Sequence, residues 1–169
     1  MNISNKGINW LKSYEGKVVA KNGRHVIYDD KTGRPIPDGC PLPPGATIGY
    51  GHLVRPGENF RDGISECQAT AILCTDLCIA ERAVRENINV TLAQHQYDAL
   101  VALAYNIGAG AFAKSTVVKY INNPSFTSVR YSSLEKAWCA WTRSNGVVMP
   151  GLIRRRNAEW QLYCSGIYR

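Results

Sequence analysis

The chain has no long apolar run. No stretch of its 169 residues approaches the roughly 18 consecutive apolar residues of a membrane-spanning helix. The first ten residues contain no apolar core of the kind found in secretory signals, so the sequence predicts no signal peptide and no stable membrane insertion. If the protein acts outside the cytoplasm, something else must release it. With 45% apolar and 20% charged residues, the chain is typical of one globular domain whose core needs no disulfides.

Several motifs of catalysis and nucleotide binding are also missing. The sequence contains no G-x-S-x-G elbow and no P-loop. The three histidines, His25, His52 and His95, lie far apart, which argues against a histidine-based metal site. A Cys–His hydrolase would need Cys40 or Cys139 beside a histidine, and nothing in the sequence supports such a pairing. We therefore expect neither a metal nor a cofactor.

Acidic residues are few compared with basic ones: 13 against 20, for a net charge of +7. This balance favours an anionic partner, such as a cell-wall polymer, anionic lipid or nucleic acid, although simple solubility explains it equally well. No nucleic-acid-binding motif and no basic stripe with interleaved aromatics is evident, so we expect no nucleic-acid partner. The densest basic run, Arg154-Arg155-Arg156, is more typical of a solvated or salt-bridged helix face than of a binding patch.

The chain contains six cysteines, which are Cys40, Cys67, Cys74, Cys78, Cys139 and Cys164. Three interpretations of them are possible. Cys74 and Cys78 are four apart and would share one face of a helix. With Cys67 they form C-x6-C-x3-C, which is not a zinc-finger spacing. Buried free thiols are the preferred interpretation, one or more disulfides come second, and a metal site is the least favoured.

The N-terminal stretch predicts a short amphipathic helix over residues 4–14. Ile8, Leu11 and Glu15 follow the spacing of one helix face, and Gly16 is a suitable stop. Glu15 would then lie at the edge of an apolar stripe. Such surroundings favour the protonated carboxyl, which suits a general acid. A glutamate at a helix end with no chemical role is the competing interpretation.

A short strand is predicted over residues 25–30, which contain good strand formers. Strand alternation places Tyr28 and Asp30 on one face and Asp29 on the other. This favours Asp30 over Asp29 as a functional carboxylate, but Asp29 remains its rival.

Residues 31–45 are rich in proline and glycine and predict an extended or turn-rich loop rather than a strand pair or a helix. A strand is predicted over residues 45–53, in which Gly49 and Gly51 would allow a bulge or a close backbone approach. The first part of the chain is thus a helix plus a small sheet.

From Ser65 onward the pattern is helical. Ser65 and Gln68 form a predicted capping box, and Thr91 with Gln94 forms a second. Residues 97–107 are apolar on nearly all sides, which indicates a central buried helix. Further helices are expected over residues 113–122, 133–142 and 152–164, with residues 144–146 separating the last two.

These elements predict a mainly α, α+β fold in a single domain. A small sheet-containing lobe would cover about residues 1–62, and a helical lobe would cover about 63–169. A groove between two such lobes is a natural place for a substrate.

The carboxylates and the threonine suggest glycoside hydrolysis, which needs one protonated and one ionised carboxyl group. Glu15 fits the acid and Asp30 the ionised partner. Thr47 offers a hydroxyl that could hold a water molecule against Asp30. His52 is interpreted as a hydrogen-bonded core histidine.

The motifs that carry this chemistry, with others farther along, resemble the phage-type lysozymes (endolysins) of glycoside hydrolase family 24. The resemblance extends from about residue 7 to residue 163. It rests on Tyr14-Glu15-Gly16, Tyr28-Asp29-Asp30, TIGYGH at residues 47–52, QYDALV at 96–101, NIG at 106–108, Trp138, Trp141, PGLIRRR at 150–156 and Glu159.

The resemblance implies a lysozyme-like two-lobed fold and cleavage of the β-1,4 bond between N-acetylmuramic acid and N-acetylglucosamine in peptidoglycan. It assigns the acid to Glu15 and implies that Asp30 and Thr47 position or activate the attacking water. It names no substrate-binding residues. It further implies a monomer that accumulates in the host cytoplasm and reaches the wall through holin lesions.

Two alternatives keep the same lobes: a lytic transglycosylase and a non-catalytic wall-binding module. The presence of Asp30 and Thr47 with Glu15 argues against both. The segment 31–46 is much longer than the tight hairpin of the family. It could reach over the groove or only decorate the edge of the lobe, and Cys40 within it could be tethered by a disulfide.

Overall fold

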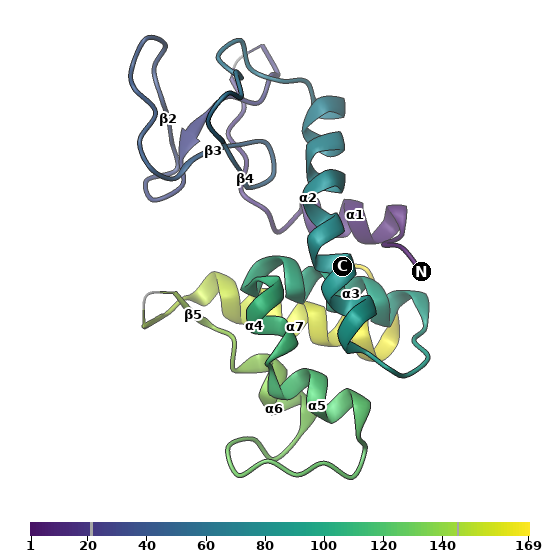
Figure 1. Cartoon of the computed structure of the whole chain (residues 1–169). Coiled ribbons are helices and arrows are strands. Elements are labelled where there is room, and N and C mark those ends of the chain that lie inside the picture. The colour runs from purple at the N-terminus through teal and green to yellow at the C-terminus, as the bar shows by residue number, and fades with distance from the viewer. Residues whose placement is uncertain (21, 145) are drawn as a thin grey trace. The chain divides into compact units, whose positions relative to one another are not determined.

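The computed structural model describes residues 1–20, 22–144 and 146–169 and shows a mainly helical protein with a small antiparallel sheet (Figure 1). The chain divides into two compact units. The sheet unit comprises Lys12–Asp76, and the helical unit comprises Met1–Leu11 together with Leu77–Arg169. The prediction of a mainly α, α+β fold is confirmed.

Within the described residues the elements follow one another in chain order, as labelled in Figure 1. They are α1 (Asn5–Lys12), β1 (Tyr28–Asp29), β2 (Arg34–Pro35), β3 (Ala46–Ile48), β4 (His52–Leu53), α2 (Glu66–Asn87), α3 (Gln94–Ile107), α4 (Ala109–Ala113), α5 (Thr116–Asn122), α6 (Leu134–Cys139), β5 (Arg143–Ser144), β6 (Val147–Val148) and α7 (Pro150–Ser165). None of the described helices combines the length and apolar character needed to cross a membrane.

The sheet of the sheet unit has the strand order β2-β1-β3-β4, with antiparallel neighbours. Its central strand β1 is shorter than the strand predicted over residues 25–30. The expectation that residues 31–45 contain no strand is wrong, because β2 lies within them and pairs with β1. Pro35 is tolerated there because β2 is an edge strand, where the missing N–H leaves no ladder bond unmade.

The predicted strand over residues 45–53 is a hairpin of β3 and β4 instead. Gly49 and Gly51 both have positive φ, of 64° and 91°, so the chain reverses between the two strands. A Cβ atom at Gly49 would lie 3.4 Å from the side chain of Ala69 on α2, an ordinary contact, so the positive φ rather than lack of space favours glycine here.

Helix α1 ends earlier than predicted. The Oγ of Ser4 accepts a hydrogen bond from the amide of Gly7 (2.9 Å), which caps the helix start. The helix stops at Lys12, and Glu15 lies in a bend beyond it rather than on the helix. The buried side of α1 is formed by Gly7, Trp10 and Leu11; of the predicted stripe only Leu11 is buried, whereas Ile8 and Glu15 are half-buried.

The strongest helix signals in the sequence are confirmed. The amide of Ser65 donates to Gln68 Oε1 (2.9 Å) and the amide of Gln68 to Ser65 Oγ (3.2 Å), which is the predicted capping box of α2. Eight consecutive residues of α3, from Tyr97 to Ala104, are buried, and α3 packs against α7. The second predicted box is displaced by two residues, because Gln96 accepts from the amide of Ala93.

The later helices differ from the predicted spans mainly at their ends. Ser115 interrupts the helix expected over residues 113–122, because its Oγ caps α5 by accepting from Val118 (3.3 Å). Ser133 caps α6 in the same way. Strand β5 ends at Ser144, the first residue of the expected separator, and β6 begins directly after it; Asn145 within the separator lies outside the described residues.

The arginine run on α7 is part of the interior of the helical unit. Arg155 Nε and Arg156 Nη2 lie 3.0 and 2.6 Å from Oε1 of Glu159, and Trp138 Nε1 donates to Oε2 at 3.1 Å. Glu159 and Arg156 are fully buried, whereas Arg154 is exposed. Arg155 and Arg156 are therefore salt-bridged, as one of the two predicted alternatives had it, but they are buried, and only Arg154 of the run lies at the surface.

The prediction of buried cysteines is wrong. Cys40, Cys67, Cys78 and Cys164 are exposed, and the other two are half-buried. Cys40 carries a free thiol, so the long segment that contains it is not tethered by a disulfide. Arg61 holds this segment instead, by donating to the carbonyl oxygens of Pro37 and Cys40.

Candidate active site

The three residues predicted to act on a substrate all belong to the sheet unit. Glu15 is half-buried and lies in the bend that follows α1. Asp30 is exposed and begins the turn that leaves β1. Thr47 is the middle residue of β3 and is only 4% exposed.

One carbonyl group holds Asp30 and Thr47 together. The Oγ1 of Thr47 donates to the carbonyl oxygen of Gly45 (2.9 Å), and the amide of Asp30 donates to the same oxygen (3.3 Å). Gly45 has a φ of 93°, which favours glycine at this point. The long segment before Gly45 therefore leaves the register of Asp30 against Thr47 intact.

The register also separates the two neighbouring aspartates. Tyr28 pairs directly with Thr47, so the two side chains share one face of the sheet, and continued alternation adds Asp30 to it. Asp29 belongs to the other face, and its Oδ1 accepts a hydrogen bond from the amide of Lys31 (2.9 Å) within the turn. Asp29 thus has a local structural role, which supports Asp30 as the functional carboxylate.

Tyr28 connects these residues to Glu15. Its hydroxyl donates to the carbonyl oxygen of Gly16 (3.2 Å), the residue that follows Glu15. Burial raises the pKa of Tyr28 to about 12, with further contributions from the negative charges of Asp30 and Glu15. The carboxylates of Asp30 and Glu15 thus both contribute negative charge to the surroundings of Tyr28.

Sequence reasoning missed a further carboxylate in the sheet unit, that of Glu66. Glu66, the first residue of α2, lies 2.6 Å from Lys12 Nζ and 3.8 Å from Lys17 Nζ. It also accepts from the hydroxyl of Tyr50 (2.5 Å) and contacts His25 Nε2 (2.8 Å). Although partial burial opposes it, hydrogen bonds from Lys12, Tyr50 and His25 lower the pKa of Glu66 to about 2.

Tyr50, in the turn of the β3–β4 hairpin, is surrounded by this network. The ammonium groups of Lys12 and Lys17 lie 5.0 and 5.3 Å from its ring centroid, within the range of cation–π attraction. The buried ring of His25 meets Tyr50 edge-on at 5.4 Å. Only the TIGYGH motif could have drawn attention to Tyr50, and it gave no indication of its partners.

His52 is a hydrogen-bonded core histidine, as predicted. Its Nδ1 lies 2.8 Å from Asp76 Oδ2, its Nε2 lies 3.0 Å from Glu58 Oε2, and the residue is 7% exposed. Burial lowers the pKa of His52, but the hydrogen bonds to Glu58 and Asp76 outweigh it and the pKa is raised overall. His52 thus fastens β4 to α2 and to the loop that carries Glu58.

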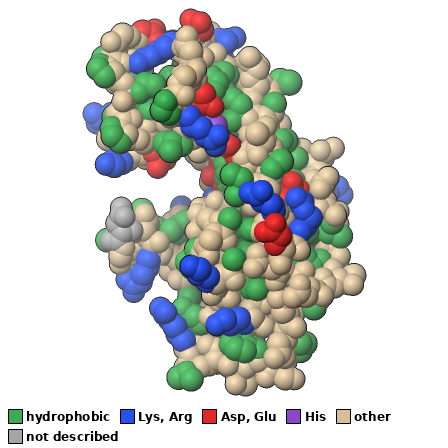
Figure 2. All heavy atoms as spheres, in the orientation of Figure 1, with side chains coloured by type: hydrophobic (Ala, Val, Ile, Leu, Met, Phe, Trp, Pro, Cys, Tyr) green, Lys and Arg blue, Asp and Glu red, His purple; other side chains and the backbone are tan. Residues whose placement is uncertain are grey.

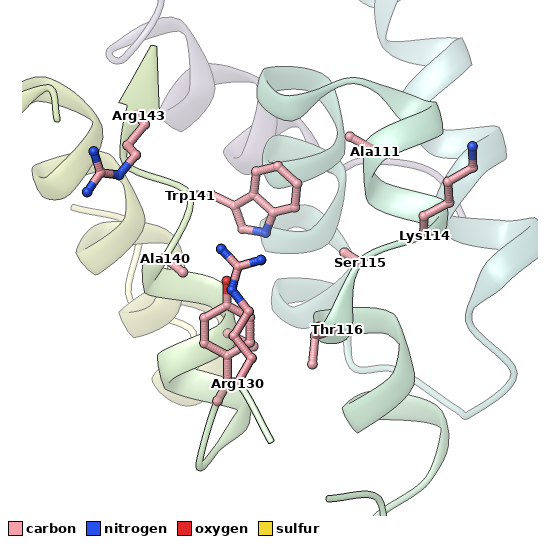
Figure 3. A pocket seen from close by; sticks show the side chains of 10 residues that line it. Ala111, Lys114, Ser115, Thr116, Arg130, Ala140, Trp141 and Arg143 are labelled. Atoms are coloured by element: carbon pink, nitrogen blue, oxygen red, sulfur yellow. The ribbon is translucent and has the colours of Figure 1, made fainter. Parts of the chain in front are cut away.

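The helical unit contains a separate cavity of about 510 Å³. Lys114, Arg130 and Arg143 contribute cationic groups to its lining, and Tyr131 and Trp141 contribute aromatic rings. Figure 3 shows Arg130 reaching toward the indole of Trp141. The described lining residues include no carboxylate, so the cavity suits an anionic or carboxylate-bearing group.

On the face of the molecule that Figure 2 shows, Lys and Arg side chains are interspersed with uncharged groups.

Comparison with known protein families matches most of the chain. The model of the family described as Phage lysozyme matches residues 24–159. The endolysin of Acyrthosiphon pisum secondary endosymbiont phage 1 is 35% identical over 169 residues, which cover 98% of this chain and 99% of the relative. The chain therefore belongs to the phage lysozyme family.

Other relatives differ in length and type. The endolysin of Bacillus phage B103 is also 35% identical over 98% of this chain, but the match covers only 55% of that protein. This chain thus spans about half the length of that relative. A SAR-endolysin of bacteriophage PS119 is 30% identical over 67% of this chain and 64% of the relative.

Solved structures agree with this assignment. The endolysin from Escherichia coli O157:H7 phage FAHEc1 superimposes with a TM-score of 0.74 at 28% identity, over 100% of this chain and 97% of the other. The muramidase domain of SpmX from Asticaccaulis excentricus superimposes with a TM-score of 0.69 at 29% identity, over 97% of this chain and 98% of the other. The fold is that of the phage lysozymes.

Proposed function

We propose that this chain is an endolysin that hydrolyses the β-1,4 bond between N-acetylmuramic acid and N-acetylglucosamine in peptidoglycan. The observation that carries the proposal is the grouping of Asp30 and Thr47 on one carbonyl group, while Tyr28, which pairs with Thr47, donates to the residue after Glu15. Membership of the phage lysozyme family and the names of the relatives, endolysins and a muramidase domain, support the same substrate.

In the proposed reaction Glu15 donates its proton to the glycosidic oxygen as the C–O bond breaks. A water molecule attacks the anomeric carbon, and Asp30 accepts the proton that this water loses. Thr47 orients the water. Because its hydroxyl hydrogen is donated to Gly45, its oxygen is available to accept a hydrogen bond from the water. Direct attack by water predicts inversion at the anomeric carbon.

The charge of the protein supports an anionic polymer as its partner. The net charge is +7, and the cavity of the helical unit carries cationic groups from Lys114, Arg130 and Arg143. Peptidoglycan bears carboxylates on its peptides, so these groups would attract the polymer and add to its binding.

The proposed place of action is the cell wall. The enzyme would accumulate in the host cytoplasm and reach its substrate after holin lesions open the membrane. Relatives named SAR-endolysins show that family members are not uniform in type. Expression with and without a holin, followed by measurement of lysis, tests this route: lysis that begins without any holin would contradict it.

The deciding experiment is fragment analysis of purified peptidoglycan after digestion by the wild type and by Glu15→Gln. Fragments with reducing N-acetylmuramic acid ends, formed by the wild type and not by Glu15→Gln, would support the proposal. The variant Glu86→Gln, an exposed glutamate on α2, is the matched control and should retain activity.

Two outcomes would contradict the proposal. Fragments with 1,6-anhydro ends would indicate a lytic transglycosylase, in which no water attacks. Binding to peptidoglycan without cleavage would indicate a wall-binding module.

A further inference from the structure

Glu66 gathers more polar partners than a helix start requires. An acidic residue in the first turn of a helix is stabilised by the helix dipole alone. Here the Glu66 carboxylate also contacts Lys12, Lys17, His25 and Tyr50, at 2.6, 3.8, 2.8 and 2.5 Å. These partners come from separate segments of the sheet unit. The side chain of Glu66 therefore joins segments that lie far apart in the sequence.

Two of these partners flank Glu15 in the sequence. Lys12 ends α1, and Lys17 follows the bend in which Glu15 lies. Because both ammonium groups contact the same carboxylate, the segment that carries Glu15 is held on both sides. The hydrogen bond from Tyr28 to the carbonyl of Gly16 adds a third restraint within this segment.

The other two partners connect Glu66 to the sheet. Tyr50 lies in the turn that follows β3, the strand of Thr47, and Lys17 Nζ donates to its hydroxyl (3.3 Å). His25 is buried, and its amide donates to the carbonyl oxygen of Ile64 (2.8 Å), just before α2. Glu66 therefore links the segment of Glu15 to the hairpin of Thr47.

Charge gives Glu66 a second effect on Glu15. Two ammonium groups near a carboxyl favour its ionised form and so oppose its use as an acid. Glu66 places a negative charge between these lysines and retains it at any pH well above its pKa of about 2. It thus offsets the positive field that Lys12 and Lys17 would otherwise impose on the segment between them.

From these contacts we propose that Glu66 is a positioning residue for the hydrolysis, which holds Glu15 in place against Thr47 and offsets the charge of Lys12 and Lys17. This inference rests on the proposed function. In its proposed role Glu66 does not touch the substrate. It acts through Lys12, Lys17 and Tyr50, and Glu15 remains the proton donor.

The test is the variant Glu66→Gln, which keeps the size of the side chain but removes its charge. The expected result is a fall in kcat of roughly 10- to 100-fold with KM changed by less than about twofold, because small misplacement of a catalytic group slows the reaction without weakening binding. Glu86→Gln, on the same helix, should match the wild type.

The pH profile separates this role from a merely structural one. With Lys12 and Lys17 no longer offset, the segment that carries Glu15 experiences a more positive field. The alkaline limb of the profile should then move to lower pH in Glu66→Gln. A variant with lower thermal stability but an unchanged profile and kcat would overturn the proposal.

Variants of the lysines keep the test decisive if Glu66→Gln does not fold. Lys12→Met removes the closer contact and should lower kcat more than Lys17→Met, whose ammonium group is farther from Glu66. Equal kcat values for both variants and the wild type would contradict the inference. A wild type that leaves peptidoglycan uncut would contradict the proposed function instead.

Discussion

Each unit of the protein has a glutamate surrounded by cations, and the two glutamates behave in opposite ways. In the sheet unit the Glu66 side chain is 51% exposed, and its pKa is lowered to about 2 by its hydrogen-bonding partners. In the helical unit Glu159 is fully buried, and burial raises its pKa despite the adjoining guanidinium groups of Arg155 and Arg156. Cationic partners alone therefore do not determine the ionisation of a carboxyl, because access to solvent decides how much charge can be sustained.

The difference suggests different uses. A buried ion pair must be complete to be tolerated, so the Glu159 cluster serves the stability of the helical unit. A half-exposed network can lose one member at a small cost in stability, because water solvates the remaining charges. Glu66 can therefore influence the proposed reaction without determining whether the sheet unit folds.

The largest expected effect is on stability, in Glu159→Gln. Removing this charge leaves the buried Arg155 and Arg156 without their carboxylate, which should cost about 3–5 kcal/mol of unfolding free energy. Thermal and urea denaturation would measure it, with the exposed Glu135→Gln as control. A loss no larger than that of Glu66→Gln would remove the contrast between the two glutamates.

Activity should be most sensitive in the sheet unit. Asp30→Asn should lower kcat by roughly 100-fold or more, because an amide cannot accept the proton of the attacking water. Asp29→Asn is the matched control, since its amide oxygen can still accept from the amide of Lys31. Initial rates on purified peptidoglycan would decide between them, and a greater loss in Asp29→Asn would reverse the assignment.

A smaller effect is expected from the pH dependence of His52. Because its pKa is raised in the folded protein, its contribution to stability is fully present below the unfolded value of about 6.5 and is lost as the pH rises through the folded value. A neutral imidazole can donate to only one of Glu58 and Asp76. As the pH rises, the free energy of unfolding should fall by about 1.5 kcal/mol, which is within the usual range for one hydrogen bond to a charged group.

Melting curves at pH 5 and pH 9 would measure this effect. Between the two pH values, the melting temperature of the wild type should fall by several degrees more than that of His52→Gln. His95 is half-buried, and His95→Gln should show the same pH dependence as the wild type. Equal pH dependence in wild type and His52→Gln would show that another group is responsible.

The sequence predicts best where a signal is local. The capping box of Ser65 and Gln68 and the buried run of α3 both depend on neighbours within a few residues. The end of α1 and the strand β2 could not be predicted in this way. The pairing of Pro35 with Tyr28 is a property of the folded sheet, and no residue near position 12 signals a stop.

The Glu66 network shows the same limit for the candidate site. Its members stand at positions 12, 17, 25, 50 and 66, and none has a spacing that indicates a shared partner. The TIGYGH motif indicates the hairpin but not the contact between Tyr50 and Glu66. These contacts join segments that lie far apart in the sequence, so their residues look ordinary in the sequence.

The smallest expected effect concerns binding, in the cavity of the helical unit. Arg130 stacks on the ring of Tyr131 at 5.2 Å, which leaves its guanidinium as a cationic part of the cavity lining. Arg130→Gln should raise KM by about two- to fivefold with kcat unchanged, because one exposed charge contributes less than about 1 kcal/mol. The difference from the wild type should shrink as salt is added.

The control is Arg154→Gln, because Arg154 is exposed and is not among the lining residues of the cavity. A change in kcat rather than KM would place Arg130 in the reaction itself. It would contradict the proposed division between a sheet unit that performs the chemistry and a helical unit that adds to binding.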